Sequence, residues 1–249
     1  MSGYPEVVGR IDHLEPVPRR IRATLGGQVV LDTLEAKYLW EFPPYPQYYV
    51  PLADVADGVL VDTGETEQHH RGKARVHTAG NGQARVYDDG VAAGLVRFDW
   101  DAMDSWFEEE EEVFVHPRDP YSRCDAIKSS RSVKVERDGL VLAESSSTVI
   151  VFETGLPPRY YFPRLAVNFE HLTPSETRTA CPYKGRTTGY WSVGKHPDLA
   201  WCYDFPTAPL LPIAGLIAFF NERVDLTIDG AAVPRPRTAF SGGIPPSDG

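Results

Sequence analysis

The strongest chemical character in the chain lies in residues 179–185, which read Thr-Ala-Cys-Pro-Tyr-Lys-Gly. The Cys181 thiol stands three residues before the Lys184 ammonium, and a nearby cation favours the reactive thiolate form. The proline and the glycine of this segment indicate a tight turn that would present both groups. We therefore predict that Cys181 or Tyr183 supplies nucleophilic or acid–base chemistry and that Lys184 clamps an anion. The structural alternative is a buried cysteine beside a turn, with the lysine extending to water.

A second candidate group is Arg159-Tyr160-Tyr161, in a stretch typical of a β-strand. Because neighbouring side chains on a strand point to opposite faces, one tyrosine enters the core while the other keeps its hydroxyl free. We predict that Arg159 and Tyr161 bind substrate, since a planar guanidinium suits a carboxylate or a phosphate. The tyrosine pair occurs again at residues 48–49, which favours a structural role for the pair, whereas a glutamine replaces the arginine there.

A third group is the segment of residues 116–121, His-Pro-Arg-Asp-Pro-Tyr. Its two prolines hold a stiff corner that carries one imidazole, one guanidinium and one carboxylate. We predict His116 as an acid–base group and Arg118 as a ligand of an anionic substrate. The same corner could instead hold two domains together through its charged residues, and the sequence leaves both interpretations open.

The chain contains the same unit twice. Residues 19–55 align with residues 131–167 at a shift of 112 without a gap, and the shared residues include Glu41 with Glu153. A residue kept in both copies is expected to serve the fold, whereas a residue present in one copy is the better candidate for chemistry. The repeat therefore gives each copy an internal control.

The alignment continues with loops of different length. A shift of 113 places Arg71 on Lys184, while the thiol of the second copy is missing from the first. Keeping the cation favours anion binding as the property of both copies, and it predicts Arg71 as a substrate ligand. The same shift, applied farther along, aligns residues 113–115 with residues 226–228.

The repeat predicts two domains, each large enough to bury a core of its own. The expected organisation is a lead-in of residues 1–18, a first repeat domain of residues 19–117, a connector of residues 118–130, a second repeat domain of residues 131–233 and a flexible tail of residues 234–249. The tail is assigned from its richness in proline, glycine and serine.

Local signals within each copy are mostly those of short β-strands. Residues 148–152 are β-branched and aromatic, as in a buried strand, and the Asp-Gly pair at residues 138–139 is typical of a hairpin turn. Helix signals are few, at residues 101–107, with Asp99 as the expected cap, and around residues 213–219. We predict a mainly β protein of two small tandem domains with few short helices.

Composition narrows the classes of partner. The formal net charge of −10 argues against general binding to nucleic acid, so we expect a small-molecule ligand. The apolar stretch of residues 209–220 is too short to span a bilayer, and no secretory signal is visible, so we expect a cytoplasmic protein that does not engage a membrane. Three cysteines without a Cys-x-x-Cys pair predict neither a disulfide framework nor a metal site.

The combined motifs resemble those of a known bacterial family. Six segments together look like the family called domain of unknown function 427, in its two-copy form: residues 116–121, 131–145, 152–164, 177–185, 190–193 and 213–230. That family is also labelled nucleotidyltransferase-like, and its folds resemble the β-tent, or Mss4-like, architecture. The resemblance thus implies two β-tent-like domains, with Mg²⁺ as a cofactor only if nucleotidyl transfer takes place. The Gly-Ser and paired aspartates that hold Mg²⁺ in many nucleotidyl transferases are absent from the sequence.

Two classes of function stay open at the level of the sequence. The first is an enzyme acting on a small anionic substrate, a nucleotide being one candidate, with Lys184, Arg159 and Arg118 on the anion. The second is a non-catalytic small-molecule-binding or scaffold module, which the lack of a phosphate-binding loop favours.

Overall fold

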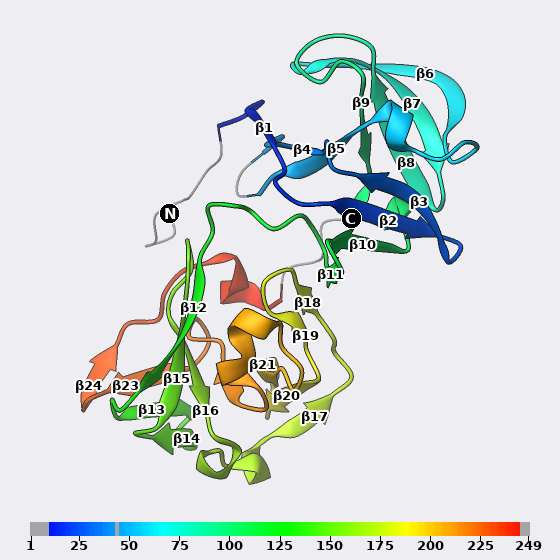
Figure 1. Ribbon diagram of the computed structural model, residues 1–249. Coiled ribbons are helices and arrows are strands. Elements are labelled where there is room, and N and C mark those ends of the chain that lie inside the picture. Colours follow the sequence, from blue (N-terminus) through cyan, green and yellow to red (C-terminus); the bar gives the residue numbers. More distant parts are fainter. Residues whose placement is uncertain (1–9, 43–44, 245–249) are drawn as a thin grey trace. The chain divides into compact units, whose positions relative to one another are not determined.

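The computed structural model of the chain describes residues 10–42 and 45–244, which divide into two compact units. The N-terminal unit comprises the described residues up to Pro120, and the C-terminal unit begins at Tyr121. Each unit contains a larger and a smaller antiparallel sheet, whose strands are drawn as arrows in Figure 1. The prediction of two tandem, mainly β domains with few short helices is confirmed.

In the N-terminal unit the larger sheet has the strand order β1-β4-β5-β9-β8-β7-β6, and the smaller sheet has the order β11-β10-β2-β3. The elements of this unit are β1 (Leu14–Pro16), β2 (Ile21–Leu25), β3 (Gln28–Thr33), β4 (Lys37–Leu39), β5 (Gln47–Pro51), η1 (Leu52–Asp54), β6 (Val61–His69), β7 (Gly72–Ala79), β8 (Gly82–Tyr87), β9 (Leu95–Phe98), η2 (Trp100–Ala102), β10 (Ser105–Glu108) and β11 (Glu111–Val113). The elements named η are short 3₁₀ helices.

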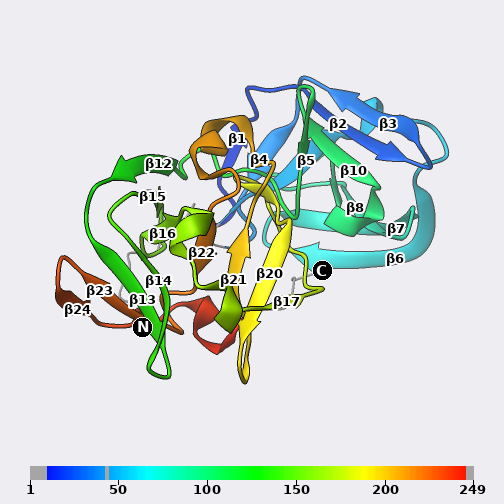
Figure 2. The same cartoon turned by 90° about the horizontal axis from the view of Figure 1, so that it is seen from below.

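The C-terminal unit repeats this order. Its larger sheet runs β12-β15-β16-β22-β21-β20-β17 and its smaller sheet β14-β13-β23-β24, while β18 and β19 form a separate ribbon. Its elements are β12 (Cys124–Ser129), β13 (Val133–Arg137), β14 (Leu140–Ser145), β15 (Thr148–Glu153), β16 (Arg159–Phe162), η3 (Arg164–Ala166), η4 (Phe169–His171), β17 (Thr173–Ser175), β18 (Ala180–Cys181), β19 (Gly185–Arg186), β20 (Gly189–Val193), β21 (His196–Cys202), η5 (Ala208–Ile213), β22 (Ile217–Phe219), β23 (Asp225–Ile228), β24 (Ala231–Val233) and η6 (Ala239–Gly242). Figure 2 shows β17, β20 and β21 side by side.

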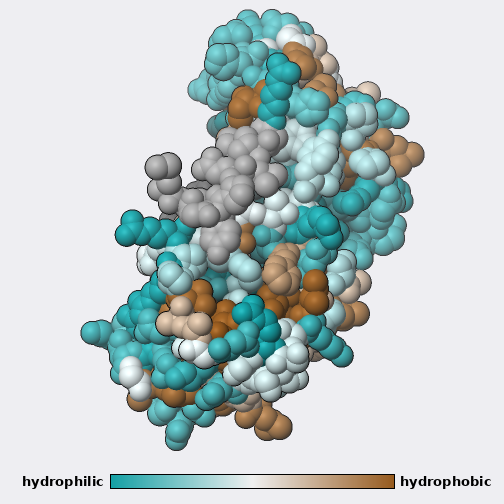
Figure 3. Space-filling model, turned by 90° about the vertical axis from the view of Figure 1, so that its left-hand side faces the viewer, coloured by the Kyte–Doolittle hydropathy of each residue, from teal (hydrophilic) through white to brown (hydrophobic). Residues whose placement is uncertain are grey.

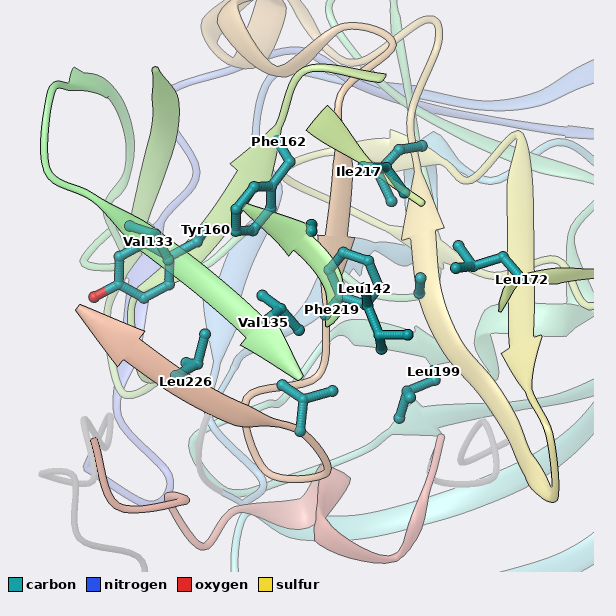
Figure 4. Close-up of a cluster of buried hydrophobic side chains, with 14 of the residues drawn as sticks. Val133, Val135, Leu142, Tyr160, Phe162, Leu172, Leu199, Ile217, Phe219 and Leu226 are labelled. Carbon is teal, nitrogen blue, oxygen red and sulfur yellow. The ribbon is translucent and has the colours of Figure 1, made fainter. Parts of the chain in front are cut away.

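The main core of each unit lies between its two sheets. In the C-terminal unit, Val135 and Leu142 of the smaller sheet meet Phe162, Leu199 and Phe219 of the larger sheet, as Figure 4 shows. All five side chains are at most 2% exposed. Truncating one of the larger ones to alanine would cost about 2–5 kcal/mol, because such a core closes only partly around the cavity left behind.

The larger sheet of the C-terminal unit is covered on both faces. Tyr160 packs in the core between the sheets, whereas Tyr161 packs on the opposite face with Phe220 and side chains of η5. Tyr161 is 0% exposed, so the prediction that one tyrosine of the pair keeps a free hydroxyl is wrong. Tyr161 is buried because η5 and Phe240 of the C-terminal segment cover it, which the alternation of side chains along the strand cannot reveal.

The strand registers correct the later part of the repeat alignment. Trp106 of β10 pairs with Ala23, and Leu226 of β23 pairs with Val135, the counterpart of Ala23. The shift at this point is therefore 120, and the alignment of residues 113–115 with residues 226–228 is wrong. Most of the difference arises in the loop that carries η5, which is longer than the loop ahead of β9.

The predicted helix at residues 101–107 is wrong. A short 3₁₀ helix, η2, is followed by strand β10, in which Trp106 and Glu108 are buried. Pairing of β10 with β2 imposes a period of two on these residues and overrides the helical signal. Asp99 makes no side-chain cap and instead accepts a hydrogen bond from Arg85 at 2.7 Å. The predicted helix around residues 213–219 is also wrong, because η5 ends at Ile213 and residues 217–219 form strand β22.

Segments outside the two predicted repeats supply edge strands. β1 of the expected lead-in pairs with β4, and β12 of the expected connector pairs with β15. In the expected tail, η6 begins after Thr238, while residues 245–249 and residues 1–9 lie outside the described residues. Across the described part of the chain, no helix combines the length and the apolar character needed to cross a membrane. Hydrophilic side chains cover most of the face shown in Figure 3.

Arg159 forms a buried ion pair in the C-terminal unit. Its Nη atoms donate to both Glu222 oxygens at 2.6 and 2.8 Å, and the Thr238 hydroxyl donates to the same carboxylate at 2.5 Å. Burial would raise the pKa of Glu222, but the hydrogen bonds from Arg159 hold it below its usual value. The guanidinium also lies within 5.8 Å of three aromatic rings, those of Trp201, Phe220 and Phe240.

Removing this guanidinium should destabilise the C-terminal unit strongly. We expect Arg159→Leu to lower the free energy of unfolding by about 3–5 kcal/mol, because Glu222 would be left buried and unpaired. Urea unfolding followed by tryptophan fluorescence measures the loss. The double variant Arg159→Leu/Glu222→Leu should recover most of it, and Arg123→Leu, at an exposed pair with Asp125, should change stability by less than about 1 kcal/mol. A loss for Arg159→Leu as small as for Arg123→Leu would contradict the assignment.

Candidate functional site

The Lys184 ammonium lies on the outer face of the larger sheet of the C-terminal unit, the face that carries Tyr161. Lys184 sits in the turn between β18 and β19, where Gly185 has a φ of 96°, a conformation that glycine adopts without strain. Lys184 Nζ lies 2.5 Å from Glu153 Oε2 and 3.6 Å from Cys181 Sγ. Glu153 ends β15 and is the ladder partner of Cys124 on β12. A turn and two strands therefore converge on one ion pair.

Two buried phenols complete this group. Tyr161 and Tyr203 both interact electrostatically with Lys184. Burial raises the pKa of both hydroxyls, so both are neutral at physiological pH. The Tyr161 hydroxyl accepts a hydrogen bond from Trp201 Nε1 at 3.4 Å. We call Glu153, Tyr161, Lys184 and Tyr203 the Lys184 cluster.

The charge of Lys184 is maintained by its neighbours. Burial lowers the pKa of the ammonium, but Cys181 and Glu153 raise it by more, and the net result lies well above the usual value. A buried cation without a partner would cost several kcal/mol, so the carboxylate is what keeps a positive charge in this position.

The N-terminal unit contains an equivalent group. Glu41 Oε1 accepts a hydrogen bond from the Tyr49 hydroxyl at 2.6 Å, and Glu41 Oε2 lies 3.6 Å from Arg71 Nη2. Arg71 Nε donates to the Tyr87 hydroxyl at 3.0 Å. Burial, followed by the charge of Glu41, raises the pKa of Tyr49 far above its usual value. We call Glu41, Tyr49, Arg71 and Tyr87 the Arg71 cluster.

The two clusters occupy the same places in the two sheets. Each glutamate follows or ends the strand next to the edge, and each outer tyrosine lies on the neighbouring strand, β5 or β16. The ladder partner of Gly72 is His69, as the ladder partner of Gly185 is Cys181. His69 therefore takes the place of the thiol in the N-terminal unit, a correspondence that the gapless shift of 113 does not show.

The surroundings of the clusters differ. Arg85 and Arg97 are ladder partners on β8 and β9, whereas Trp201 and Ala218 are the corresponding partners on β21 and β22. In the N-terminal unit a pocket of about 180 Å³ opens beside the cluster. The residues that line this pocket are Glu41, His69, Arg71, Arg85, Tyr87, Arg97 and Asp99. In the C-terminal unit aromatic side chains pack over the corresponding strands.

Four of the residues singled out in the sequence meet in the C-terminal unit. Cys181, Lys184 and Tyr161 belong to or adjoin the Lys184 cluster, and Tyr183 lies in the same turn. The Tyr183 carbonyl accepts a hydrogen bond from the Thr207 hydroxyl at 2.5 Å, which fastens this turn to the segment ahead of η5.

The other candidates have different surroundings. Arg159 shares a face with Tyr161, but its guanidinium is engaged by Glu222. The His116 ring stacks on Tyr45, with 3.6 Å between the ring centroids. Arg118 lies 3.4 Å from Glu108, whose other oxygen accepts from Tyr48, on the opposite face of β5 from Tyr49. Arg71, which was also predicted as a substrate ligand, belongs to the Arg71 cluster, where it contacts Tyr87 and Glu41.

Glu41, Glu153, Tyr87 and Tyr203 were not predicted as site residues. The repeat alignment did contain the signal, because both glutamates are identical positions of the two copies. Identity between the copies predicts a role in the fold, but a carboxylate at the end of an apolar strand also needs a cationic partner. In the structure the cationic partner of Glu41 is Arg71, and that of Glu153 is Lys184.

Fold and site together define a protein of two tandem β domains, each with a largely buried ion pair flanked by two phenols. Among the described residues, no group of three or more His, Cys, Asp or Glu side chains is placed to hold a metal ion. In comparisons with known families, residues 13–109 and 125–230 match the family described as Domain of unknown function (DUF427). The chain therefore belongs to this family, in two copies, and the predicted resemblance is confirmed. The family's short label is that of a nucleotidyl transferase, and no curated protein matches the chain.

The three cysteines should differ in reactivity. We expect iodoacetamide at pH 8 to modify Cys181 before Cys124 and Cys202, because burial raises the pKa of the Cys124 thiol to about 12 and also raises that of Cys202. Peptide mass spectrometry after timed alkylation measures the order, with the urea-unfolded protein as the control in which all three react. Preferential labelling of Cys124 in the folded protein would contradict the expected order.

Alkaline pH should destabilise the protein through its buried phenols. Burial raises the pKa of Tyr48, Tyr49, Tyr161 and Tyr203 in the folded chain. Above pH 10 these hydroxyls ionise in the unfolded chain but not in the folded one, so stability is intact below that pH and falls as pH rises, by about 1.4 kcal/mol per unit per tyrosine. Urea unfolding at pH 9 and pH 11, with phenolate absorbance at 295 nm, tests this. Full ionisation of all tyrosines at pH 11 in a folded protein would be inconsistent with it.

Proposed function

We propose that the protein binds a small anionic molecule at the cation of each polar cluster, Arg71 or Lys184, and that the C-terminal unit acts on such a molecule as an enzyme. The observation that carries this proposal is the repetition of one polar arrangement, a carboxylate, a cation and two phenols, on the outer face of both larger sheets. Guanidinium and ammonium groups held in this way are typical ligands of carboxylates and phosphates.

Stability alone explains the arrangement poorly. Replacing a buried ion pair by apolar residues of similar volume is often neutral or stabilising. Such a replacement is seen next to the clusters, where the C-terminal unit has the apolar residues Trp201 and Ala218 and the N-terminal unit has Arg85 and Arg97. The cluster residues are retained beside these changes, which supports a role in binding.

The Lys184 cluster is the better candidate for catalysis because Cys181 Sγ lies 3.6 Å from Lys184 Nζ. The ammonium would hold the anionic group of the substrate, and Cys181 or Tyr183 would act as nucleophile or as acid–base group. The N-terminal unit has His69 in the place of the sulfur, so its proposed role is to bind a ligand.

A nucleotide is the substrate that the family's label favours. Nucleotidyl transfer would require Mg²⁺, held in part by the phosphates of the substrate. A small-molecule partner, in preference to nucleic acid or a membrane, agrees with the net charge of −10, and a cytoplasmic location belongs to the same proposal.

A non-catalytic small-molecule-binding module is the second candidate function, and one observation favours it. Each cation already faces a carboxylate, at 2.5 Å for Lys184 and at 3.6 Å for Arg71. A neutralised cation can orient a ligand without any chemical step. The two functions differ in whether Cys181 is required after binding.

The proposal is tested by a thermal-shift screen of the full chain against nucleotides and small phosphates, with and without Mg²⁺. A ligand at a hundred times its dissociation constant stabilises by about 2.7 kcal/mol, or on the order of 5–10 °C for a chain of this size. We expect the shift to fall in Lys184→Met/Glu153→Gln, a double variant that removes both charges of the pair and leaves neither unpaired. Cys181→Ser should keep the shift and lose turnover if this unit is an enzyme.

The matched control is Lys134→Met, at a partly exposed ion pair with Glu136 on the smaller sheet of the same unit, which should keep the full shift. A corresponding variant of the first unit is Arg71→Met/Glu41→Gln. The proposal would be rejected by the absence of any shift, or by a shift that neither double variant reduces.

A further inference from the structure

The pocket beside the Arg71 cluster is polar on all sides. Its lining consists of guanidinium, carboxylate, imidazole and phenol groups. The volume of about 180 Å³ lies below the range of about 300–1,000 Å³ that is typical of pockets for drug-sized ligands. Such a space suits a small polar molecule.

Two guanidiniums in this pocket share one carboxylate. Arg97 Nε lies 3.3 Å from Glu41 Oε1, and within the described residues this buried N–H has no hydrogen-bond partner. Arg71 Nη2 lies 3.6 Å from Glu41 Oε2, which is longer than a hydrogen bond. Glu41 Oε1 is meanwhile occupied by the Tyr49 hydroxyl. Neither guanidinium is fully engaged by Glu41, and unused donors are costly, so this end of the pocket is where an acceptor atom of a ligand is expected. Arg97 Nε itself is buried, so the ligand would reach the terminal nitrogens of the two guanidiniums.

The other end of the pocket is satisfied internally. Arg85 donates to Glu67 at 3.2 Å and to Asp99 at 2.7 Å. Asp99 also accepts from Arg97 Nη1 and from the backbone N–H of Gln83. The unused hydrogen-bonding capacity therefore lies around Glu41, Arg71 and Arg97.

Charge in and around the pocket favours a ligand that is more than a bare anion. The three arginines of the lining face two carboxylates there, and Glu67 and Asp12 contact two of the same arginines from beyond the lining. No excess of positive charge remains to hold an anion by charge alone. Glu41 Oε2, without a hydrogen bond to Arg71, is at the same time an acceptor that a donor group could use.

We infer that this pocket binds a small molecule that carries an oxyanion group and a hydrogen-bond donor on the neighbouring carbon, as α-hydroxy acids and α-amino acids do. The oxyanion takes the free donors of Arg71 and Arg97, and the hydroxyl or ammonium group of the ligand donates to Glu41. This inference rests on the proposed function and narrows it to a ligand class for the N-terminal unit.

The C-terminal unit provides a natural comparison. Ala218 occupies the position of Arg97, and Trp201 occupies that of Arg85, so the second guanidinium of the clamp is missing at the corresponding positions. The same ligand should therefore bind the N-terminal unit and not the C-terminal one. Because the second copy folds with alanine at this position, Arg97→Ala is a variant that the fold accommodates.

Titration calorimetry of the full chain with glycolate, glycine, acetate and inorganic phosphate tests the inference. We expect glycolate, glycine or both to bind, with acetate at least tenfold weaker because it has no donor for Glu41. Comparison of glycolate with glycine separates a hydroxy acid from an amino acid. Arg97→Ala should weaken binding at least tenfold, and Arg75→Ala, at an exposed pair with Asp88 in the same unit, should leave it unchanged.

A second variant, Glu41→Gln, keeps the shape of the side chain and should reduce the advantage of glycolate or glycine over acetate. Acetate or phosphate binding as tightly as the best bifunctional ligand would overturn the inference, as would the absence of binding by all four compounds. In either case a nucleotide shift that depends on Lys184 would leave the proposed function standing. Binding that Arg97→Ala abolishes, without any ligand for the Lys184 cluster, would support the inference and reject the proposed catalysis.

Discussion

The alternation of side chains along one central strand links the core of each unit to its polar cluster. In β5 and β16 a pair of tyrosines sends one ring between the sheets and the other to the outer face. The outer ring is buried as well, so its hydroxyl needs a polar partner. Tyr49 finds this partner in Glu41, and the carboxylate in turn requires a cation, which Arg71 supplies. Because the second face of the larger sheet is covered, Tyr49 needs Glu41 as a hydrogen-bond partner, and Glu41 needs Arg71 to balance its charge.

Much of the fold could be predicted because strands leave short-range patterns. Residues 148–152 have the composition of a buried strand and form most of β15. The errors occurred where a distant segment decides the outcome. β10 is a strand because it pairs with β2, and Tyr161 is buried because η5 and Phe240 cover it. Neither cause is visible within a window of a few residues.

The same limit applies to the candidate site. Cys181 and Lys184 could be associated from their spacing within one turn, but Glu153 stands 31 positions away in the sequence. Arg159 has the chemistry of a ligand contact, and what separates it from one is Glu222, 63 positions later. The sequence can therefore identify charged residues as candidates, but only the folded sheet shows which of them are engaged in ion pairs and which are available to a ligand.

Strand β12 is the first element of the C-terminal unit that a pull on the connecting segment would act on. The boundary between the units falls at Pro120 and Tyr121, and the chain enters β12 only a few residues later. β12 is an edge strand, held in its sheet by one ladder to β15, and its first residue, Cys124, is the ladder partner of Glu153. Tension along the connecting segment would first load the hydrogen bonds between Arg123 and Thr154 and then separate the ladder from its end at Cys124. Local opening of a single edge strand would then admit water to the Lys184 cluster while the remaining sheet stays intact.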